Sequence, residues 1–319
     1  MPLICYHASH EQFAPSHLLR LVTLAEAAGF DGVHSSDHFH PWSERQGHSG
    51  FTFSWIAAAL QATNIPFSMI CTPGQRYHPA VTAQAIATLC EMFPGRVGFE
   101  MGSGEALNEI ITGDDWPEKA QRNERLLQSV QVIRQLLQGR EVNAHDLVKV
   151  SNAKLYTLPT VQPLLLCAAM SARTAAWAGS WADGLLTTVE KDFDKTKEKV
   201  DAFRQNGGGE KPIYLQLGCS YGRVRKQAQE GLFDQWRSNI LPREKLESFR
   251  AVKDFDNAAT AVTMQEVLEA IPVYTDMEAL WEKIHSLEAL QPERIVIHNI
   301  NRQQEQFIED FQHTLVFRS

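Results

Sequence analysis

Eight short apolar segments, each followed by a longer segment with helical spacing, constrain the fold of this chain most strongly. Apolar strands that alternate with helices form a parallel sheet whose outer face the helices cover. Eight such units predict a (β/α)8 barrel of the TIM type, and a doubly wound open sheet is the alternative. The predicted strands are residues 3–9, 32–37, 66–73, 96–104, 163–169, 184–188, 213–220 and 294–300.

Apolar residues at helical intervals define the connections between these strands, as in residues 16–29. The connection formed by residues 221–292 is too long for a single helix between neighbouring strands, so we expect a mostly helical insertion before the last strand. We therefore interpret residues 1–319 as one barrel domain with an insertion at about 221–292. Further helices are expected at 53–63, 79–92, around 126–137, 171–180, 190–205 and 303–315.

Charge and composition exclude several classes of partner. The net charge of −8 gives no field that attracts nucleic acid or an anionic membrane. No apolar run approaches the ~20 residues of a membrane helix, and the N-terminal sequence lacks the features of a signal peptide, so we expect a cytoplasmic protein. The odd number and wide spacing of the cysteines predict reduced thiols rather than disulfides or a zinc site. They are Cys5, Cys71, Cys90, Cys167 and Cys219.

Polar residues gather where the predicted strands end. In a (β/α)8 barrel, the residues that carry chemistry lie at the C-terminal ends of the strands. The interiors of the strands are apolar, whereas their ends contain many titratable side chains, so we expect the site at this end of the barrel. The ends read HASHEQ, SSDHFHPW, CTPG, GSGEALNE, CAAMS, LTTVEK, GCSYG and HNI.

The stretch SSDHFHPW raises the possibility of a metal site. His38 and His40 are two residues apart, so on a strand both would project to one face and could share an ion. A hydrolytic metal centre needs further ligands from later strand ends. The fifth and sixth strands end without a histidine, and His298 is the only late histidine near a strand end. We therefore expect no metal.

Catalysis and core packing are the two remaining interpretations of the histidines. An isolated histidine in an apolar setting is commonly a core residue, and we expect this of His34 and His298, which lie inside predicted strands. His38 differs because it follows Asp37, which could fix its tautomer, and precedes Trp42. A histidine held by a carboxylate and surrounded by aromatic rings suits proton transfer beside a planar ring.

The stretch GSGEALNE, residues 102–109, is a second candidate element. Gly102 and Gly104 allow a sharp turn that brings backbone amides near a ligand, and Glu105 and Asn108 lie three apart on the following helix. The alternative is an ordinary helix that Ser103 caps. The glycine spacing does not match a dinucleotide-binding fingerprint.

Taken together, five stretches resemble the luciferase-like flavin and deazaflavin oxidoreductases, a (β/α)8 family. Within it they are similar to the glucose-6-phosphate dehydrogenases that use the deazaflavin coenzyme F-420. The similarity is dense over residues 3–137, continues to about 188 and becomes patchy in the insertion. The stretches are YHASHEQFAP, SDHFHPW, TPGQRYHPAVTAQAIATL, FPGRVGFEMGSGEALNEI and WADGLLTT.

The resemblance implies roles for particular residues. His38 matches the base that removes the substrate hydroxyl proton, Trp42 the residue that steadies the developing charge, and Glu105 the acid that protonates the reduced ring. Glu11 matches a glutamate after the first strand. A cis peptide bond is common in the family and would fall at Met69–Ile70. The implied cofactor contacts are Asp37, Met69, Ile70, Thr72, Gly102, Ser103, Gly104, Asn108, Ala168, Ala169, Met170 and Ser171.

The chain departs from those dehydrogenases at the substrate phosphate. Thr188 and Lys191 keep two of the four phosphate-binding positions, and an ungapped alignment of residues 255–276 places Asn257 and Ala270 at the others. Each lost cation removes a charge-assisted bond of ~1.5–3 kcal/mol. Glucose 6-phosphate is therefore not the expected substrate.

The loop at residues 170–172 departs from the family pattern as well. It reads Met-Ser-Ala where the dehydrogenases have Gly-Gly-Pro, and Ser171 offers an anion site at a helix N-terminus. This favours a related subgroup that binds FMN. We expect a homodimeric, FMN-dependent oxidoreductase that acts on a small organic substrate. Hydride transfer and a monooxygenase reaction served by a separate flavin reductase are both open. The alternatives are an F-420-dependent alcohol or aldehyde dehydrogenase and a non-catalytic flavin-binding protein.

Overall fold

The computed structural model describes residues 1–314 and confirms the predicted (β/α)8 barrel. Eight parallel strands close into a barrel, because β9 pairs with β8 on one side and with β11 on the other. Each predicted strand overlaps one of them; residue 315, the last of the predicted closing helix, lies outside the described residues. The strands are β1 (Leu3–Ala8), β2 (Gly32–Ser35), β3 (Phe67–Cys71), β4 (Val97–Met101), β7 (Leu165–Ala168), β8 (Leu185–Thr188), β9 (Ile213–Tyr221) and β11 (Arg294–Asn299).

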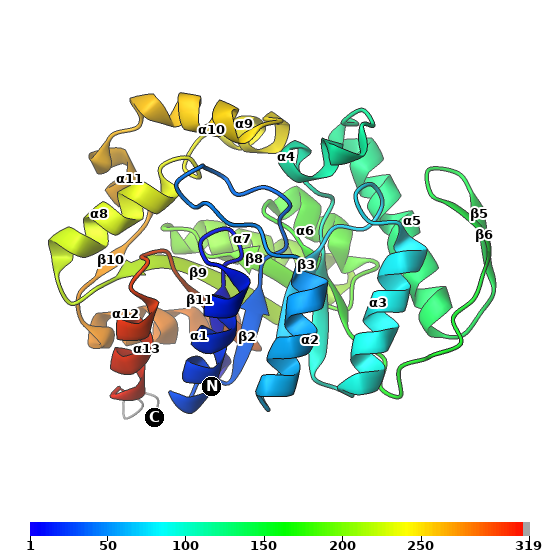
Figure 1. Ribbon diagram of the computed structural model, residues 1–319, viewed down its shortest axis with the longest axis horizontal. Coiled ribbons are helices and arrows are strands. Elements are labelled where there is room, and N and C mark those ends of the chain that lie inside the picture. The colour runs from blue at the N-terminus through cyan, green and yellow to red at the C-terminus, as the bar shows by residue number, and fades with distance from the viewer. Residues whose placement is uncertain (315–319) are drawn as a thin grey trace.

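Helices cover the outside of the barrel, and their apolar faces point toward the strands (Figure 1). In α1, Leu18, Leu21, Val22 and Ala25 are fully buried, which stabilises the fold by ~1.5–3 kcal/mol for each of the larger side chains. The outer helices are α1 (Pro15–Ala27), α2 (Thr52–Ala62), α3 (Pro79–Met92), α5 (Lys119–Leu137), α6 (Ala172–Gly179), α7 (Phe193–Phe203), α12 (Met277–Leu287) and α13 (Gln304–Gln312).

Side chains alternate along each strand between the outer helices and the barrel interior. On β3, Phe67, Met69 and Cys71 belong to the main core under the helices, while Ile70 packs on a smaller inner cluster. That inner cluster consists of Leu166, Leu186 and Tyr214, with Ile70 and Ala168 against it. It fills the middle of the barrel and leaves the mouth above it to polar side chains.

Residues 222–276, which we call the mouth segment, lie across the C-terminal end of the barrel (Figure 1). Trp281 and Ile284 of α12 join the main core, so α12 is the barrel helix between β9 and β11 and is not part of this segment. The segment has a small core of its own around Leu232 and Val267. Its elements are α8 (Arg225–Trp236), α9 (Arg243–Ser248), α10 (Val252–Ala258), α11 (Met264–Ala270) and β10 (Val273–Tyr274).

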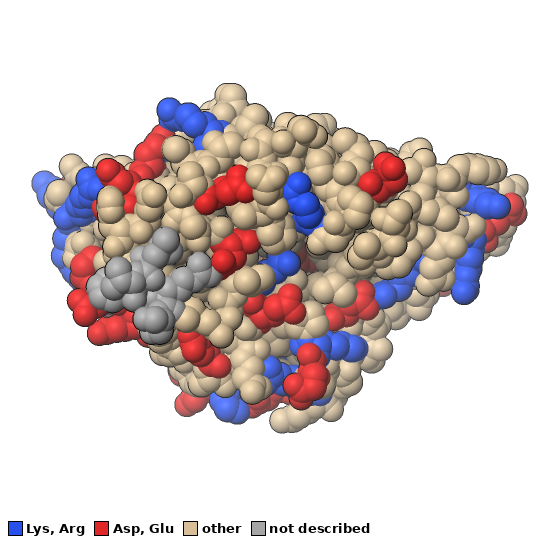
Figure 2. Space-filling model, turned by 90° about the horizontal axis from the view of Figure 1, so that it is seen from below, with Lys and Arg blue, Asp and Glu red and all other residues tan. Residues whose placement is uncertain are grey.

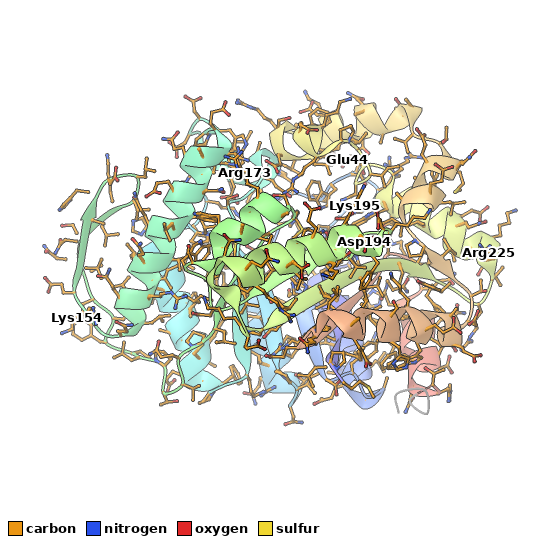
Figure 3. The ribbon with its side chains drawn as sticks, turned by 180° about the vertical axis from the view of Figure 1, so that it is seen from behind. Glu44, Lys154, Arg173, Asp194, Lys195 and Arg225 are labelled. Carbon is orange, nitrogen blue, oxygen red and sulfur yellow. The ribbon has the colours of Figure 1, made fainter. Side chains whose placement is uncertain are left out.

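An antiparallel hairpin of β5 (Val142–His145) and β6 (Lys149–Ala153) follows α5 and was not predicted. Surface side chains such as Lys154 and Arg225 point away from the ribbon (Figure 3), and acidic and basic groups are interspersed over the lower face (Figure 2). Within residues 1–314, every helix falls short of the length and apolar character that crossing a lipid bilayer demands.

Candidate active site

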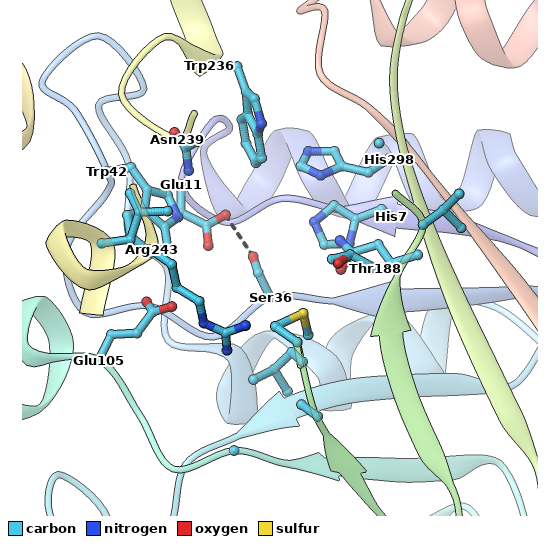
Figure 4. Close-up of a pocket in the computed structure, with 18 of the residues that line it drawn as sticks. His7, Glu11, Ser36, Trp42, Glu105, Thr188, Trp236, Asn239, Arg243 and His298 are labelled. Atoms are coloured by element: carbon cyan, nitrogen blue, oxygen red, sulfur yellow. Dashed lines mark hydrogen bonds between the residues drawn. The ribbon is translucent and has the colours of Figure 1, made fainter. Parts of the chain in front are cut away.

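A pocket of about 790 Å³ opens at the mouth of the barrel, between the strand ends and the mouth segment (Figure 4). Its volume is that of sites that hold a drug-sized ligand or cofactor. Most of the predicted site residues line it, whereas Met69, Ala169 and Ser171 do not. The predicted residues that line it are Glu11, Asp37, His38, Trp42, Ile70, Thr72, Gly102, Ser103, Gly104, Glu105, Asn108, Ala168, Met170, Thr188 and Lys191.

Strand geometry explains two of these wrong predictions. Met69 follows the alternation of β3 and points to the outer helices, and Ala169 is buried in the same core. The expected cis peptide at Met69–Ile70 is also wrong. Among the described residues all peptide bonds are trans, and β3 keeps a continuous parallel register with β4 through both residues. Ile70, which points inward, is the one that lines the pocket.

Ser171 caps the helix that follows β7. It is the N-cap of α6, and its Oγ accepts a hydrogen bond of 3.3 Å from the backbone N–H of Thr174. Ser171 does not line the pocket, and the anion site expected at this helix N-terminus stays a prediction. Thr174 lines the pocket one turn further along, and the side chain of Met170 occupies the rim.

Asn108 fixes the tautomer of His38. The amide oxygen of Asn108 accepts hydrogen bonds from the backbone N–H groups of Phe39 (2.9 Å) and His40 (3.0 Å), so the amide nitrogen must face His38. That nitrogen lies 3.1 Å from Nδ1 of His38 and can only donate. Nδ1 of His38 therefore accepts, and the ring proton is on Nε2, which lies 3.4 Å from Oε1 of Glu11.

Asp37 does not hold His38, so that expectation is wrong. Its carboxylate accepts hydrogen bonds from Arg76 (2.9 Å) and from the Tyr77 hydroxyl (3.1 Å). Burial raises the pKa of Asp37, and the guanidinium of Arg76 opposes that rise. Arg76 also lies 3.4 Å from Glu109. This buried network ties together the loops that follow β2, β3 and β4.

Glu11 faces the pocket as a carboxylate. Its Oε2 accepts hydrogen bonds of 2.8 Å from the hydroxyls of Ser9 and Ser36, which leaves Oε1 for His38. Burial acts to raise the pKa of Glu11, but His38 and these hydrogen bonds outweigh it and lower the pKa. The ring of Trp42 lies 5.1 Å from that of His38 and completes the group.

Glu105 faces the same pocket and lies below Glu11 and Trp42 in the view of Figure 4. Burial raises its pKa to about 7. Gly104 precedes it with φ of +77°, and a Cβ there would lie 2.6 Å from Cγ of Glu109, so only glycine fits this turn. Ser103 does not cap the following helix α4 (Ala106–Glu109); it accepts a hydrogen bond from Lys119 (2.9 Å) instead.

The other histidines differ from expectation. His40 donates from Nδ1 to the carbonyl of Leu107 (2.9 Å) and lies away from the pocket lining, so the paired geometry considered for a metal is not formed. His34 and His298 are buried as predicted, but both line the pocket floor together with His7. His34 and His298 are therefore buried core residues that also contact the space in which a ligand would bind.

Cationic side chains line the pocket at positions that the sequence pattern did not indicate. Arg243 of α9 reaches into the pocket (Figure 4), and Lys283 of α12 lines it as well. Ala270 lines the pocket, whereas Asn257 does not. Lys119, at the start of α5, and Arg76 are further cations of the lining.

Known proteins share this architecture. The family model described as luciferase-like monooxygenase matches residues 5–293. The chain belongs to the luciferase-like monooxygenase family. Relatives in the family include F-420-dependent glucose-6-phosphate dehydrogenases from Mycolicibacterium fortuitum, 34% identical over 97% of this chain and 96% of that protein, and from Mycobacterium tuberculosis, 34% identical over 98% and 96%.

Solved structures agree with this assignment. An F-420-dependent secondary alcohol dehydrogenase, solved in complex with an F-420–acetone adduct, is 28% identical, with a TM-score of 0.90 and complete coverage of both chains. A long-chain alkane monooxygenase has a TM-score of 0.75 at 14% identity, over 100% of this chain and 92% of that one, which shows the shared fold. The family resemblance inferred from the sequence is thus confirmed.

Proposed function

We propose that this protein is an F-420-dependent oxidoreductase that interconverts a small alcohol and its carbonyl compound. The observation that carries the proposal is the convergence of Glu11, His38 and Glu105 on one pocket in a family whose similar members use F-420. A flavin carrier has no need of these three titratable groups. The expected primary cofactor was FMN, and the similarity to F-420-dependent relatives favours the alternative.

The pocket fits a flat tricyclic cofactor. Ile70 and Ala168 give it an apolar base, and the turn at Gly102 and Gly104 leaves room that a side chain would fill: a Cβ on Gly102 would lie 3.3 Å from Thr72. Such a cofactor, when bound, supplies the hydride acceptor. Lys119 and Arg243 would face its anionic side chain from the rim.

His38 and Glu11 together handle the substrate proton. Because Asn108 holds Nδ1 of His38, the Nε2–H group is the one that donates a hydrogen bond to the substrate oxygen, and the carboxylate of Glu11 accepts the hydroxyl proton. In this proposal His38 is a hydrogen-bond donor and Glu11 is the base, whereas the family resemblance implied that His38 is the base. Glu105, with its pKa raised to about 7 by burial, holds a further proton in the same pocket.

Cofactor titration tests the proposal. The purified apoprotein is titrated separately with F-420 and with FMN while fluorescence is followed. Micromolar or tighter binding of F-420 with weak binding of FMN supports the proposal. Preferential binding of FMN overturns it in favour of the second candidate, an FMN-dependent enzyme, which the bulkier loop of Met170 favours and for which oxygen consumption becomes the next assay. Binding of neither cofactor overturns both.

Substrate assays then define the alcohol. With F-420 bound, a panel of short secondary alcohols is compared with glucose 6-phosphate at equal concentration. We expect turnover of unphosphorylated alcohols, because Lys191 donates to the carbonyl of Glu269 (2.9 Å) and is engaged in the protein. Lys283 remains as a cation of the lining. Exclusive turnover of the sugar phosphate would show that these two lysines suffice as a phosphate clamp.

A further inference from the structure

The pocket floor carries a second set of titratable side chains that the proposed function does not use. His7 on β1 and His34 on β2 are 5% and 1% exposed, and their Nδ1 atoms lie 2.8 Å apart. On the far side of His34, Nε2 lies 3.8 Å from Oε2 of Glu100 on β4, less than ~1 Å beyond hydrogen-bond distance. The three side chains form a row from the pocket into the closed interior of the barrel.

The chemistry of the row leaves little choice of proton positions. The short contact between His7 and His34 requires one Nδ1 to donate and the other to accept. Both rings are neutral, since burial lowers the pKa of His34 to about 3 and that of His7 well below its usual value. Burial raises the pKa of Glu100 to about 7. The group that gains or loses a proton near neutral pH is therefore the carboxyl.

We propose that Glu100, His34 and His7 form a proton relay that exchanges one proton with a carbonyl, alkoxide or ring-nitrogen group of a molecule bound on the pocket floor. In one direction the O–H bond of Glu100 breaks as the Nε2–H bond of His34 forms. The Nδ1–H bond of His34 breaks as the Nδ1–H bond of His7 forms. The proton on Nε2 of His7 passes to the bound molecule.

This sequence balances without an additional reactant. One proton enters the pocket, one negative charge remains on Glu100, and both imidazoles end neutral with their protons on the other nitrogen. The reverse sequence removes a proton from the bound molecule and stores it on Glu100. The relay therefore changes the proton count of the pocket without placing a positive charge on either imidazole, and the guanidinium of Arg294 offsets the negative charge that remains on Glu100.

Groups on the neighbouring strands bias the relay. The ring of His298 is tilted against that of His7, with ring centres 4.1 Å apart, and its Nε2 lies 3.2 Å from Oε1 of Gln12, so His298 lies beside the row and not within it. The guanidinium of Arg294 favours the carboxylate form of Glu100. The titratable and charged groups that face the relay are Arg294 and His298 on β11, Tyr214 on β9, Cys71 on β3, His10 and Glu11 after β1, and His38 after β2.

Nitrogen NMR on the apoprotein tests the relay directly and does not depend on the cofactor. Protein with 15N-labelled histidine is titrated from mildly acidic to mildly alkaline pH, and His7 and His34 are assigned with His7→Gln and His34→Gln variants. We expect His34 to switch from the Nδ1–H to the Nε2–H tautomer near neutral pH while His7 switches in the opposite sense. Neither ring should show an imidazolium shift.

Two variants separate the relay from other titrations. Glu100→Gln removes the carboxyl and should abolish both tautomer switches, whereas Glu105→Gln, which removes the other carboxyl with a pKa near 7, should leave them unchanged. Tautomers that stay fixed in the wild-type protein overturn the proposal, whether or not the variants fold. A switch that persists in Glu100→Gln overturns it as well. Because no cofactor is present, either result is independent of the F-420 assignment.

Discussion

The two sides of the pocket are held in place by different means. On the barrel side, Glu11 and His38 are at most 15% exposed in their side chains, and each is hydrogen-bonded to a residue from another strand end, Ser36 and Asn108 respectively. On the opposite side, Arg243 is 41% exposed and belongs to α9, a helix with no buried residues. Groups that must keep one tautomer or charge need fixed partners, whereas groups that select a ligand tolerate a loosely packed element. We infer that the barrel side performs proton transfer and the mouth segment selects the ligand.

The largest expected effect is that of Glu11→Gln. The amide cannot accept the hydroxyl proton, so kcat should fall ~10²–10⁴-fold, the usual range for loss of a general base. Binding of F-420, followed by fluorescence, should stay within the wild-type range. Ser9→Ala is the matched control, since it removes one hydrogen bond to Glu11 but keeps the carboxylate. An unchanged kcat in Glu11→Gln would contradict the role of base and the division between the two sides.

The pH dependence of stability tests the barrel interior through Glu100. Its pKa of about 7 in the folded protein exceeds the ordinary value of 4.5, so the folded state binds this proton more tightly than the unfolded state. The resulting stabilisation is complete below pH 4.5 and is lost as pH rises through 7. Glu100→Gln should remove this loss. Between mildly acidic and mildly alkaline pH, the free energy of unfolding of the wild type should therefore fall by about 3 kcal/mol more than that of Glu100→Gln.

Urea denaturation of both proteins at the two pH values measures that difference. Glu44→Gln is a suitable control because Glu44 is exposed and lies outside the pocket. An equal pH dependence of wild type and Glu100→Gln would show that Glu100 titrates as an ordinary carboxyl, and the barrel side would then lack its proton store.

The sequence predicted the barrel side better than the mouth segment, for physical reasons. Apolar strands and amphipathic helices alternate around the barrel, so the strand ends, and with them Glu11, His38 and Glu105, could be located from the pattern alone. The mouth segment lacks this alternation. Arg243 and the lysine of α12 reach the pocket through tertiary packing that local spacing does not encode.

Partners that are distant in the chain limited the prediction even on the barrel side. Asp37 was expected to fix the adjacent His38, but Asn108, which is 70 residues away, does so. A local carboxylate is the obvious candidate in a linear sequence. Asp37 is instead bound by Arg76, which is 39 residues away in the chain and donates a hydrogen bond to its carboxylate.

Asn108→Asp tests whether Asn108 fixes the tautomer of His38, and its expected effect is smaller. The carboxylate can still accept the two backbone N–H groups, but its second oxygen cannot donate to His38, so the proton of His38 should move to Nδ1. Nε2 would then face Glu11 with a lone pair. We expect kcat to fall about 10-fold, which is ~1.4 kcal/mol of barrier, and the 15N spectrum of His38 to report the new tautomer. Asn257→Asp on α10, outside the pocket, is the matched control.

Arg243→Ala probes the mouth segment and should give the smallest effect. The guanidinium is partly exposed and already pairs with Glu247 (2.9 Å), and ion pairs of this exposure contribute ~0.2–1 kcal/mol. The Kd for F-420 should therefore rise at most about fivefold, with kcat unchanged, and the rise should shrink at high ionic strength because the Debye length falls. Arg250→Ala is the control, an exposed arginine just beyond α9 that does not line the pocket. A fall in kcat with unchanged Kd would place Arg243 among the groups that act on the reacting atoms. The division between a catalytic barrel side and a selecting mouth segment would then not hold.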